Sequence, residues 1–371
     1  MYRDAEAHVD SRRTALLTAL LGGCLLALAV ILFYQPARAR TREAERLVPR
    51  RASTAYTYTV FLPYAQSSQT QTVAPPPPLW ATIDTRAASR SFYLTNFVSD
   101  TDAIPIGWTG DMSNCISGTV SVDFRAAVLR RVNFFRAMAG VPDNLTLNEQ
   151  FNRTAQAAAL MMSRNGTLTH SPSPSMLCYS DDGYAGASTS NLALGANGTT
   201  AINLYMMDAG TYNTAAGHRR WILFPKTRET GVGDIPASSN YMAANALHDY
   251  DNNIWSLRPA TREPFVAWPP PGYVPYTIVY PRWTFAYDGA NFDTAVVTMT
   301  QNGSSISVAQ AAPEYGYGEN ALVWIPLGLQ DYSPWPKPAA DTTYHVEVGN
   351  VMINSQPRSF TYDVTVYDPA Y

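Results

Sequence analysis

An uncharged apolar run near the N-terminus limits where the rest of the chain can fold. Residues 14–33 form a stretch of about 20 residues without charge, which is long enough to cross a bilayer as a helix. Ala37-Arg38-Ala39, just after it, has the small-x-small form of a signal-peptidase site. Segment 14–36 is therefore predicted to be a transmembrane signal-anchor or a cleaved signal peptide. Both alternatives place the bulk of the chain outside the cell.

Two sequence features bear on this prediction. Arginines are denser after the run than before it, and by the positive-inside rule alone that would keep the C-terminal part in the cytoplasm. The downstream composition instead favours export, since charged residues make up only 15% of a chain rich in Tyr and Pro. Leu21-Gly22-Gly23-Cys24 loosely resembles a lipoprotein box, but the apolar run continues well past Cys24. The net charge of −3, with no basic block, argues against nucleic acid as a partner.

Changes in composition divide the chain into five segments. The four prolines at 75–78 form a polyproline II spacer, so the residues around them are predicted to hold the folded part away from the membrane. Aromatic and polar residues mix without a clear period over residues 79–118, and only short strands and loops are expected there. The predicted layout is an N-terminal tail (1–13), the transmembrane or signal segment (14–36), a stalk or linker with short strands (37–118), a central domain (119–275) and a β-sandwich (276–371).

The central domain is predicted to begin with two helices. Phe124, Val128, Val132 and Phe135 recur at helical spacing. Ser121 or Asp123 can cap the start of this helix, and Gly140 followed by Pro142 ends it. A second, Ala-rich helix is expected from about Asn148 to the stop at Asn165-Gly166. Short helices are expected near residue 200 and around His218.

From about residue 276 the pattern becomes β. The strands predicted at 294–300 and 304–309 flank Asn302-Gly303, which is a strong hairpin signal. Apolar and polar residues then alternate over residues 360–367. About seven short strands within about 95 residues favour an immunoglobulin-like or fibronectin-like sandwich. This sandwich is expected to serve in adhesion, as a spacer, or as a shield for one side of a binding cleft in the central domain.

Two cysteines lie beyond the apolar run. Cys115 and Cys178 could pair in an oxidising compartment, or they could be two buried thiols. A bridge would tie the segment that enters the central domain to the loop after His170.

Five short motifs over residues 121–240 carry a family resemblance. They are Asn133 to Gly140 in the first helix, Leu145-Thr146-Leu147-Asn148 before the second, Leu168-Thr169-His170, Gly217-His218-Arg219-Arg220-Trp221-Ile222-Leu223, and Thr230-Gly231-Val232-Gly233. In this order they resemble the bacterial SCP-like branch of the CAP superfamily, which includes cysteine-rich secretory proteins, antigen 5 and pathogenesis-related-1 proteins. The resemblance implies an α+β protein with a CAP-type α–β–α sandwich and a surface cleft.

The resemblance also implies the residues of the cleft. His170 and His218 match the two histidines of the family. Ser190-Asn191-Leu192-Ala193 aligns with the family's Glu-Asn-Leu-Ala, so Ser190 stands where the first acid would be. Asp208 is the nearest candidate for the second acid. His248 lies in a polar loop at 246–251 that could flank the cleft.

This residue set limits the chemistry that the cleft can perform. A stable zinc site needs three or four protein ligands, whereas here two imidazoles and at most one carboxylate are expected. Weak binding of a divalent metal such as Zn by His170 and His218 is the most that we expect, and no cofactor is firmly implied. Ser190, His218 and Asp208 could be written as a hydrolytic triad, but no nucleophile elbow is present. The sequence therefore does not establish an enzyme.

The sequence predicts an extracellular protein, either anchored in the membrane through residues 14–33 or secreted. The resemblance implies that its cleft binds a small apolar, lipid-like or cell-envelope ligand, such as a polysaccharide. The residues expected in the cleft are His170, Ser190, Asn191, Asp208 and His218. Two alternatives remain: a hydrolase that uses the same cleft, and a structural or adhesive surface protein in which the cleft is vestigial.

Overall fold

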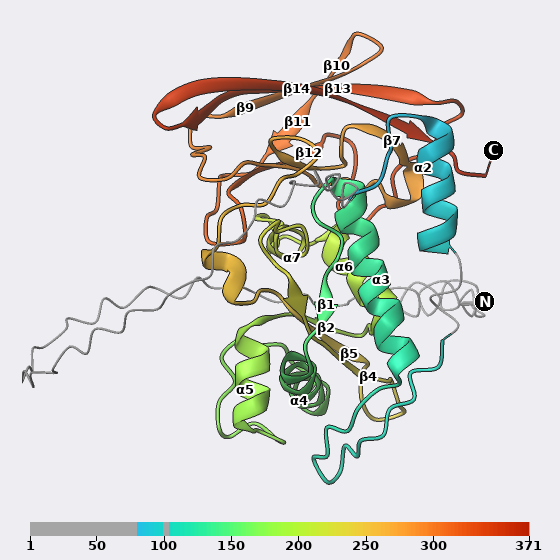
Figure 1. The fold of residues 1–371 in the computed structure, drawn as a ribbon, viewed down its shortest axis with the longest axis vertical. Helices are drawn as coiled ribbons and strands as arrows, with labels where there is room; N and C mark the ends of the chain where they lie inside the picture. The colour runs from blue at the N-terminus through green and yellow to red at the C-terminus, as the bar shows by residue number, and fades with distance from the viewer. Residues whose placement is uncertain (1–79, 99–103, 371) are drawn as a thin grey trace, which may run out of the picture. The chain divides into compact units, whose positions relative to one another are not determined.

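The computed structural model describes residues 80–98 and 104–370, which form a mixed α+β structure (Figure 1). Its helical elements are α2 (Arg86–Tyr93), η1 (Leu94–Val98), α3 (Val122–Ala139), α4 (Glu149–Asn165), α5 (Asp181–Ser188), α6 (Gly198–Met207), α7 (Gly217–Ile222), η3 (Asn252–Trp255) and η4 (Tyr276–Ile278). Its strands are β1 (Thr146–Leu147), β2 (Ser190–Leu194), β3 (Glu229–Thr230), β4 (Val232–Ile235), β5 (Ala244–His248), β6 (Val266–Trp268), β7 (Gly272–Pro275), β8 (Trp283–Ala286), β9 (Val296–Gln301), β10 (Ser304–Ile306), β11 (Val308–Gln310), β12 (Ala321–Pro326), β13 (Thr342–Ile353) and β14 (Gln356–Tyr367).

The two predicted helices of the central region are confirmed as α3 and α4. The Ser121 hydroxyl accepts a hydrogen bond from the Phe124 amide at 3.2 Å and caps α3. Asn148 caps α4 through the amides of Gln150 and Phe151. Both helices end at a glycine in the left-handed region, Gly140 and Gly166, where a residue without Cβ is favoured. Local sequence therefore sets the ends of both helices.

A three-stranded antiparallel sheet lies between helices. Its strand order is β2-β5-β4, and every residue of the three strands is buried. α4 and α5 pack against one face, while α3, α6 and α7 lie on the other side (Figure 1). A Cβ at Gly186 or at Gly233 would overlap the backbone of α4. These two glycines therefore let α5 and β4 approach the Ala-rich helix closely.

The C-terminal strands form two larger sheets. One sheet has the order β10-β9-β13-β14-β7 and the other the order β11-β12-β8-β6. The predicted hairpin at Asn302-Gly303 is confirmed, because β9 and β10 pair on either side of it and both turn residues have positive φ. Aromatic rings join the two sheets, as in the 5.2 Å contact between Phe285 and Phe360. The predicted strand over residues 360–367 is the second half of β14.

The prediction of only short strands and loops for residues 79–118 is wrong over α2. This helix packs beside β7, and the Ser89 hydroxyl donates to the Tyr273 carbonyl at 2.7 Å. Arg86 and Arg90 donate to the carbonyls of Asp368 and Pro369, near the end of the chain. The helix has few apolar residues, so its stability depends on these distant partners. Residues 80–98 thus pack on the C-terminal sheets, although a stalk was expected there.

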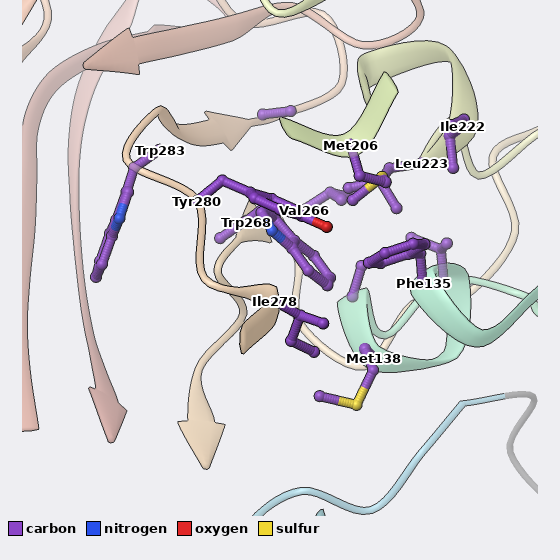
Figure 2. Close-up of a cluster of buried hydrophobic side chains, with 14 of the residues drawn as sticks. Phe135, Met138, Met206, Ile222, Leu223, Val266, Trp268, Ile278, Tyr280 and Trp283 are labelled. Atoms are coloured by element: carbon purple, nitrogen blue, oxygen red, sulfur yellow. The ribbon is translucent and has the colours of Figure 1, made fainter. Parts of the chain in front are cut away.

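The expected boundary between residues 275 and 276 also differs from the structure. β6 and β7 precede it, yet each is hydrogen-bonded into one of the C-terminal sheets. Figure 2 shows that Phe135 and Met138 of α3 share one buried cluster with Trp268 and Ile278. The Phe135 and Trp268 rings lie 5.3 Å apart. One continuous core therefore serves the helical region and the C-terminal sheets.

No helix within the described residues is long and apolar enough to cross a membrane. The predicted span at 14–33 and the proline spacer at 75–78 lie outside those residues.

Cys115 and Cys178 form a disulfide with a Cα–Cα distance of 5.1 Å.

Candidate functional site

Helix α7 brings His218 into contact with a buried acid. The His218 Nδ1 atom lies 2.7 Å from Oδ1 of Asp208, so the ring donates its Nδ1 proton to the carboxylate. Tyr205 of α6 stacks on the imidazole, with ring centroids 5.5 Å apart. These two contacts fix both the tautomer and the orientation of the ring. The Nε2 atom is the other nitrogen of the His218 ring, and this ring lines a pocket.

Asp208 lies behind His218 and does not line this pocket. It is 0% exposed and ends α6 in the left-handed region. Burial alone would raise its pKa, but the charges of His218, Arg282 and Arg219 together with the His218 hydrogen bond hold the pKa of Asp208 below its usual range. The second acid that the resemblance implied is therefore an ionised partner of His218.

His170 lies on the opposite side of the same pocket from α7, in the loop after α4. Its Nδ1 atom is 2.8 Å from the Ala187 carbonyl, so Nδ1 carries the proton and donates it. Burial lowers the pKa of His170, the Ala187 bond opposes that shift, and the charge of His218 adds to it. His170 is therefore a neutral imidazole near pH 7. The structure brings the two predicted histidines together.

The pocket is completed by residues from the sheet and from the C-terminal region. Asn191, Trp221, Asp249 and Tyr317 line it together with the histidines. The space inside it that a water-sized sphere can reach is about 20 Å³, which is room for about one water molecule. The Asn191 side chain donates to the His218 carbonyl at 3.1 Å, which ties β2 to α7. Of the sequence-predicted residues, His170, Asn191 and His218 meet at this pocket.

Ser190 is not part of the pocket. It is 1% exposed and pairs with His248 in the β2–β5 register. Its hydroxyl has no hydrogen-bond partner among the described residues, so it lacks the bond to His218 that a triad requires. His248 is also outside the pocket, since its ring stacks on Phe151 at 3.8 Å and burial lowers its pKa to about 4. The triad of Ser190, His218 and Asp208 is not assembled.

Asp249 is an acid that the sequence did not single out. It follows β5, and its Oδ1 atom accepts a hydrogen bond from the Asn191 amide at 3.0 Å. Burial raises the pKa of Asp249 well above its usual value, although that hydrogen bond opposes the shift. The only signal in the sequence was its place at the end of a strand beside His248. Asp249 is therefore the carboxyl group that shares the pocket with the histidines.

These residues do not fit a metal site. Within residues 80–98 and 104–370, no group of three His, Cys, Asp or Glu residues could hold a metal ion. The Asp208 carboxylate is engaged by His218 and by the Arg219 amide, and burial favours the uncharged form of Asp249. A stable zinc site would need at least one more ligand. The weak metal binding expected of His170 and His218 gains no support from this geometry.

Arg282, which immediately precedes β8, holds the loop that carries two further lining residues. Its guanidinium donates to the carbonyls of Asp208, Gly210 and Asn213. The same group forms a 2.7 Å ion pair with Asp331. Three carbonyls of one short loop therefore converge on one buried cation, and Tyr212 lies within that loop at the edge of the pocket.

Arg219 and Arg220 of α7 connect the pocket helix to the C-terminal sheets. Arg219 donates to the Arg282 carbonyl at 2.6 Å. Arg220 donates to the carbonyls of Glu314 and Glu319, and its guanidinium lies over the Tyr317 ring, 5.2 Å from the centroid. Because these partners lie about 60 to 100 residues further along the chain, sequence motifs could not identify them.

Comparison with known proteins identifies one family. The model of the cysteine-rich secretory protein family, CAP, matches residues 129–256. Two solved structures of the methionine-rich copper resistance protein PcoC from Escherichia coli share 17% and 16% identity. They cover 27% and 29% of this chain and 92% and 99% of PcoC, each with a TM-score of 0.21, which is too low to establish a shared fold. A comparison with curated proteins finds no match.

The matched residues include α4, both pocket histidines, Asn191 and Asp249. They stop before Arg282 and Tyr317, which belong to the C-terminal region. Residues 129–256 of this chain are therefore similar to the cysteine-rich secretory protein family, CAP.

Proposed function

We propose that this chain is an extracellular CAP protein that binds a small ligand in the pocket between His170 and His218. CAP proteins are generally extracellular or secreted, which agrees with the apolar run at residues 14–33 and with a disulfide between Cys115 and Cys178. We further propose that the run anchors the chain in a membrane or is removed as a signal peptide.

One observation carries this proposal. His218 is held by Asp208 at 2.7 Å and by the Tyr205 ring, so a polar group of the pocket keeps one orientation before any ligand arrives. A pre-organised polar group loses little conformational entropy on binding. A ligand that matched it would gain affinity without first ordering the site.

A hydrolase is the second candidate, and the pair of Asp208 and His218 is the observation in its favour. Such a pair could activate a water molecule as a general base. The pocket lining, as far as the described residues form it, contains no Ser, Thr or Cys, so a covalent route has no nucleophile of these types. The binding proposal needs no such group and accounts for more of the geometry.

The C-terminal sheets fit the same proposal. We propose that they form an immunoglobulin-like or fibronectin-like sandwich beside a CAP-type α–β–α sandwich. Tyr317 brings a residue of these sheets to the pocket, which supports a role in shielding one side of it. Adhesion with a vestigial pocket remains the third candidate.

Replacement of both histidines tests the proposal. The double variant His170→Ala/His218→Ala of the full chain is compared with His345→Ala, which removes an exposed histidine paired with Asp363 in the C-terminal sheets. Each protein is titrated with fatty acids, a sterol and neutral and acidic oligosaccharides, and thermal unfolding checks the fold. We expect one probe class to bind the native chain and the control, and to bind the double variant at least about tenfold more weakly.

Three other results would change the conclusion. If no probe binds the native chain, the binding proposal fails. Turnover of a probe that depends on His218 would favour the hydrolase. A double variant that binds as well as the native chain would place the ligand elsewhere.

A further inference from the structure

We propose that the ligand is an uncharged saccharide residue and that Tyr212 provides the aromatic face on which the sugar ring stacks. This inference rests on the proposed binding function and specifies the chemical class of its ligand. Four features of the pocket support it: a lining without lysine or arginine among the described residues, its converging polar groups, its aromatic residues, and the loop that holds Tyr212.

No lysine or arginine side chain lines the pocket among the described residues. Three arginines lie near it, but none of them lines it among the described residues. Arg219 and Arg282 are buried and donate to backbone carbonyls, and Arg220 does the same. Phosphate and carboxylate groups are usually recognised by such cations. An acidic headgroup or an acidic sugar would therefore find no arginine or lysine in this lining.

The polar groups that do line the pocket suit hydroxyl groups. Asn191 carries both a donor and an acceptor, and the His218 ring has a second nitrogen besides the bonded Nδ1 atom. Asp249 adds a carboxyl group whose uncharged form is favoured by burial. A hydroxyl both donates and accepts hydrogen bonds, so a ring with several hydroxyls can satisfy this mixed set. An acyl chain would leave these groups without partners, which costs free energy.

Aromatic side chains supply the apolar part of the recognition. Trp221 lines the pocket wall, and Tyr212, at 66% exposed, lies at its edge. The C–H bonds on one face of a pyranose ring pack well on an aromatic face, while its hydroxyl groups point outward to polar partners.

The loop that carries Tyr212 is held in place before binding. Arg282 donates to the carbonyls on either side of Tyr212, at Gly210 and Asn213. Asp331 also accepts a hydrogen bond from the Gly210 amide at 2.8 Å. An exposed aromatic residue on a fixed loop binds at a lower entropic cost than one on a mobile loop. The geometry thus makes Tyr212 a pre-organised binding residue.

The test uses the full chain and four variants. Tyr212→Ala removes the aromatic face, Tyr212→Trp keeps one, and Asp249→Asn keeps an uncharged polar group at that position. Tyr184→Ala removes an exposed tyrosine on α5 that does not line the pocket and serves as the matched control. The probes are neutral oligosaccharides built from glucose, mannose, galactose and N-acetylglucosamine, an oligogalacturonate, and a fatty acid, all titrated by calorimetry.

We expect at least one neutral oligosaccharide to bind the native chain. Tyr212→Ala should weaken its binding about tenfold or more, while Tyr212→Trp and Tyr184→Ala should change it less than about threefold. Asp249→Asn, which alters one polar group of the pocket, should weaken binding less than Tyr212→Ala does. Thermal unfolding of each variant shows whether the fold is retained.

The outcomes separate this inference from the proposed function. If only the fatty acid or the acidic sugar binds, and that binding needs His170 and His218, the binding function stands and the uncharged saccharide is wrong. Sugar binding that Tyr212→Ala leaves unchanged would show that the aromatic face is not needed and would also overturn the inference. If no probe binds at all, both proposals fall.

Discussion

Asp234 in β4 shows how one buried carboxyl group can set a pH limit on stability. Its Oδ1 atom accepts hydrogen bonds from the Gly198 amide at 2.7 Å and from the Asn245 side chain at 2.8 Å. Its Oδ2 atom has no partner among the described residues. Burial raises the pKa of Asp234 to about 6, although both hydrogen bonds oppose the shift. The folded state therefore favours the protonated acid.

Asp234→Asn should remove the pH dependence that this acid causes. Since the pKa of Asp234 is higher in the folded chain, the acid favours folding below about pH 4, and this contribution is lost as the pH rises to about 6 and above. The amide of Asn cannot ionise and can keep both Oδ1 bonds. We expect Asn to raise the free energy of unfolding at pH 7.5 by on the order of 1 to 2 kcal/mol, with little change at pH 4.

Chemical denaturation of both proteins across this pH range would measure the effect. Asp181→Asn, at an exposed position of α5, is the control and should not show the same dependence. A stability difference at position 234 that is equal at pH 4 and pH 7.5 would contradict the prediction.

Single residues also show how far the sequence could specify the site. His170, His218 and Asn191 could be identified because each lies in a short motif that resembles a family pattern. Asp249 and Arg282 could not, because what they do depends on contacts 58 and 74 residues apart, with Asn191 and Asp208. A motif search identifies residues whose partners are close in sequence. Asp249 and Arg282 instead contact residues that are distant in sequence.

At the scale of elements, the helices with clear capping residues were the most predictable part of the fold. α3 and α4 begin at Ser121 and Asn148 and end at glycines, and all four signals are visible in the chain itself. α2 has a Thr85 cap but is only eight residues long, and it is stabilised by contacts with residues near the other end of the chain. Its local sequence therefore could not reveal it.

The disulfide is an element-scale constraint on the loop that carries His170. It joins Cys115, in the segment before α3, to Cys178, in the connection between α4 and α5, across 63 residues. That connection also contains His170. The bridge therefore restrains the connection that carries His170 in the folded chain. It also limits the conformations of the unfolded chain.

Removing the bridge with Cys115→Ser/Cys178→Ser should lower stability by about 2 to 4 kcal/mol, because the unfolded chain gains conformational freedom. Thermal unfolding with and without a reducing agent measures this. A reducing agent should lower the melting temperature of the native chain and leave that of the variant unchanged. A native chain that is insensitive to complete reduction would contradict the prediction.

At the scale of the whole described structure, the helical region and the C-terminal sheets depend on each other. They share the core that contains Phe135 and Trp268, and the buried guanidinium of Arg219 finds acceptors at Arg282 and Thr284. Separating the two regions would leave this cation without part of its hydrogen-bond set, which is costly for a buried charge.

A chain that ends at residue 275, where the sequence suggested a boundary, should therefore fail to fold on its own. Residues 80–275 are expected to aggregate or to unfold without a cooperative transition, whereas residues 80–371 should show one. Circular dichroism and calorimetry of the two chains decide the matter. A sharp thermal transition in the shorter chain would show that the helical region is an independent domain.

The two adjacent arginines of α7, Arg219 and Arg220, have a consequence for the evolution of the chain. Both point to acceptors outside the matched CAP residues, so this helix is fitted to one particular neighbour. Recombination that exchanged residues 265–370 for an unrelated module would remove part of the hydrogen-bond set of both buried cations at once. The two regions should therefore be passed on together, and a chain with this Arg-Arg pair after its last pocket histidine should also carry the matching C-terminal sheets.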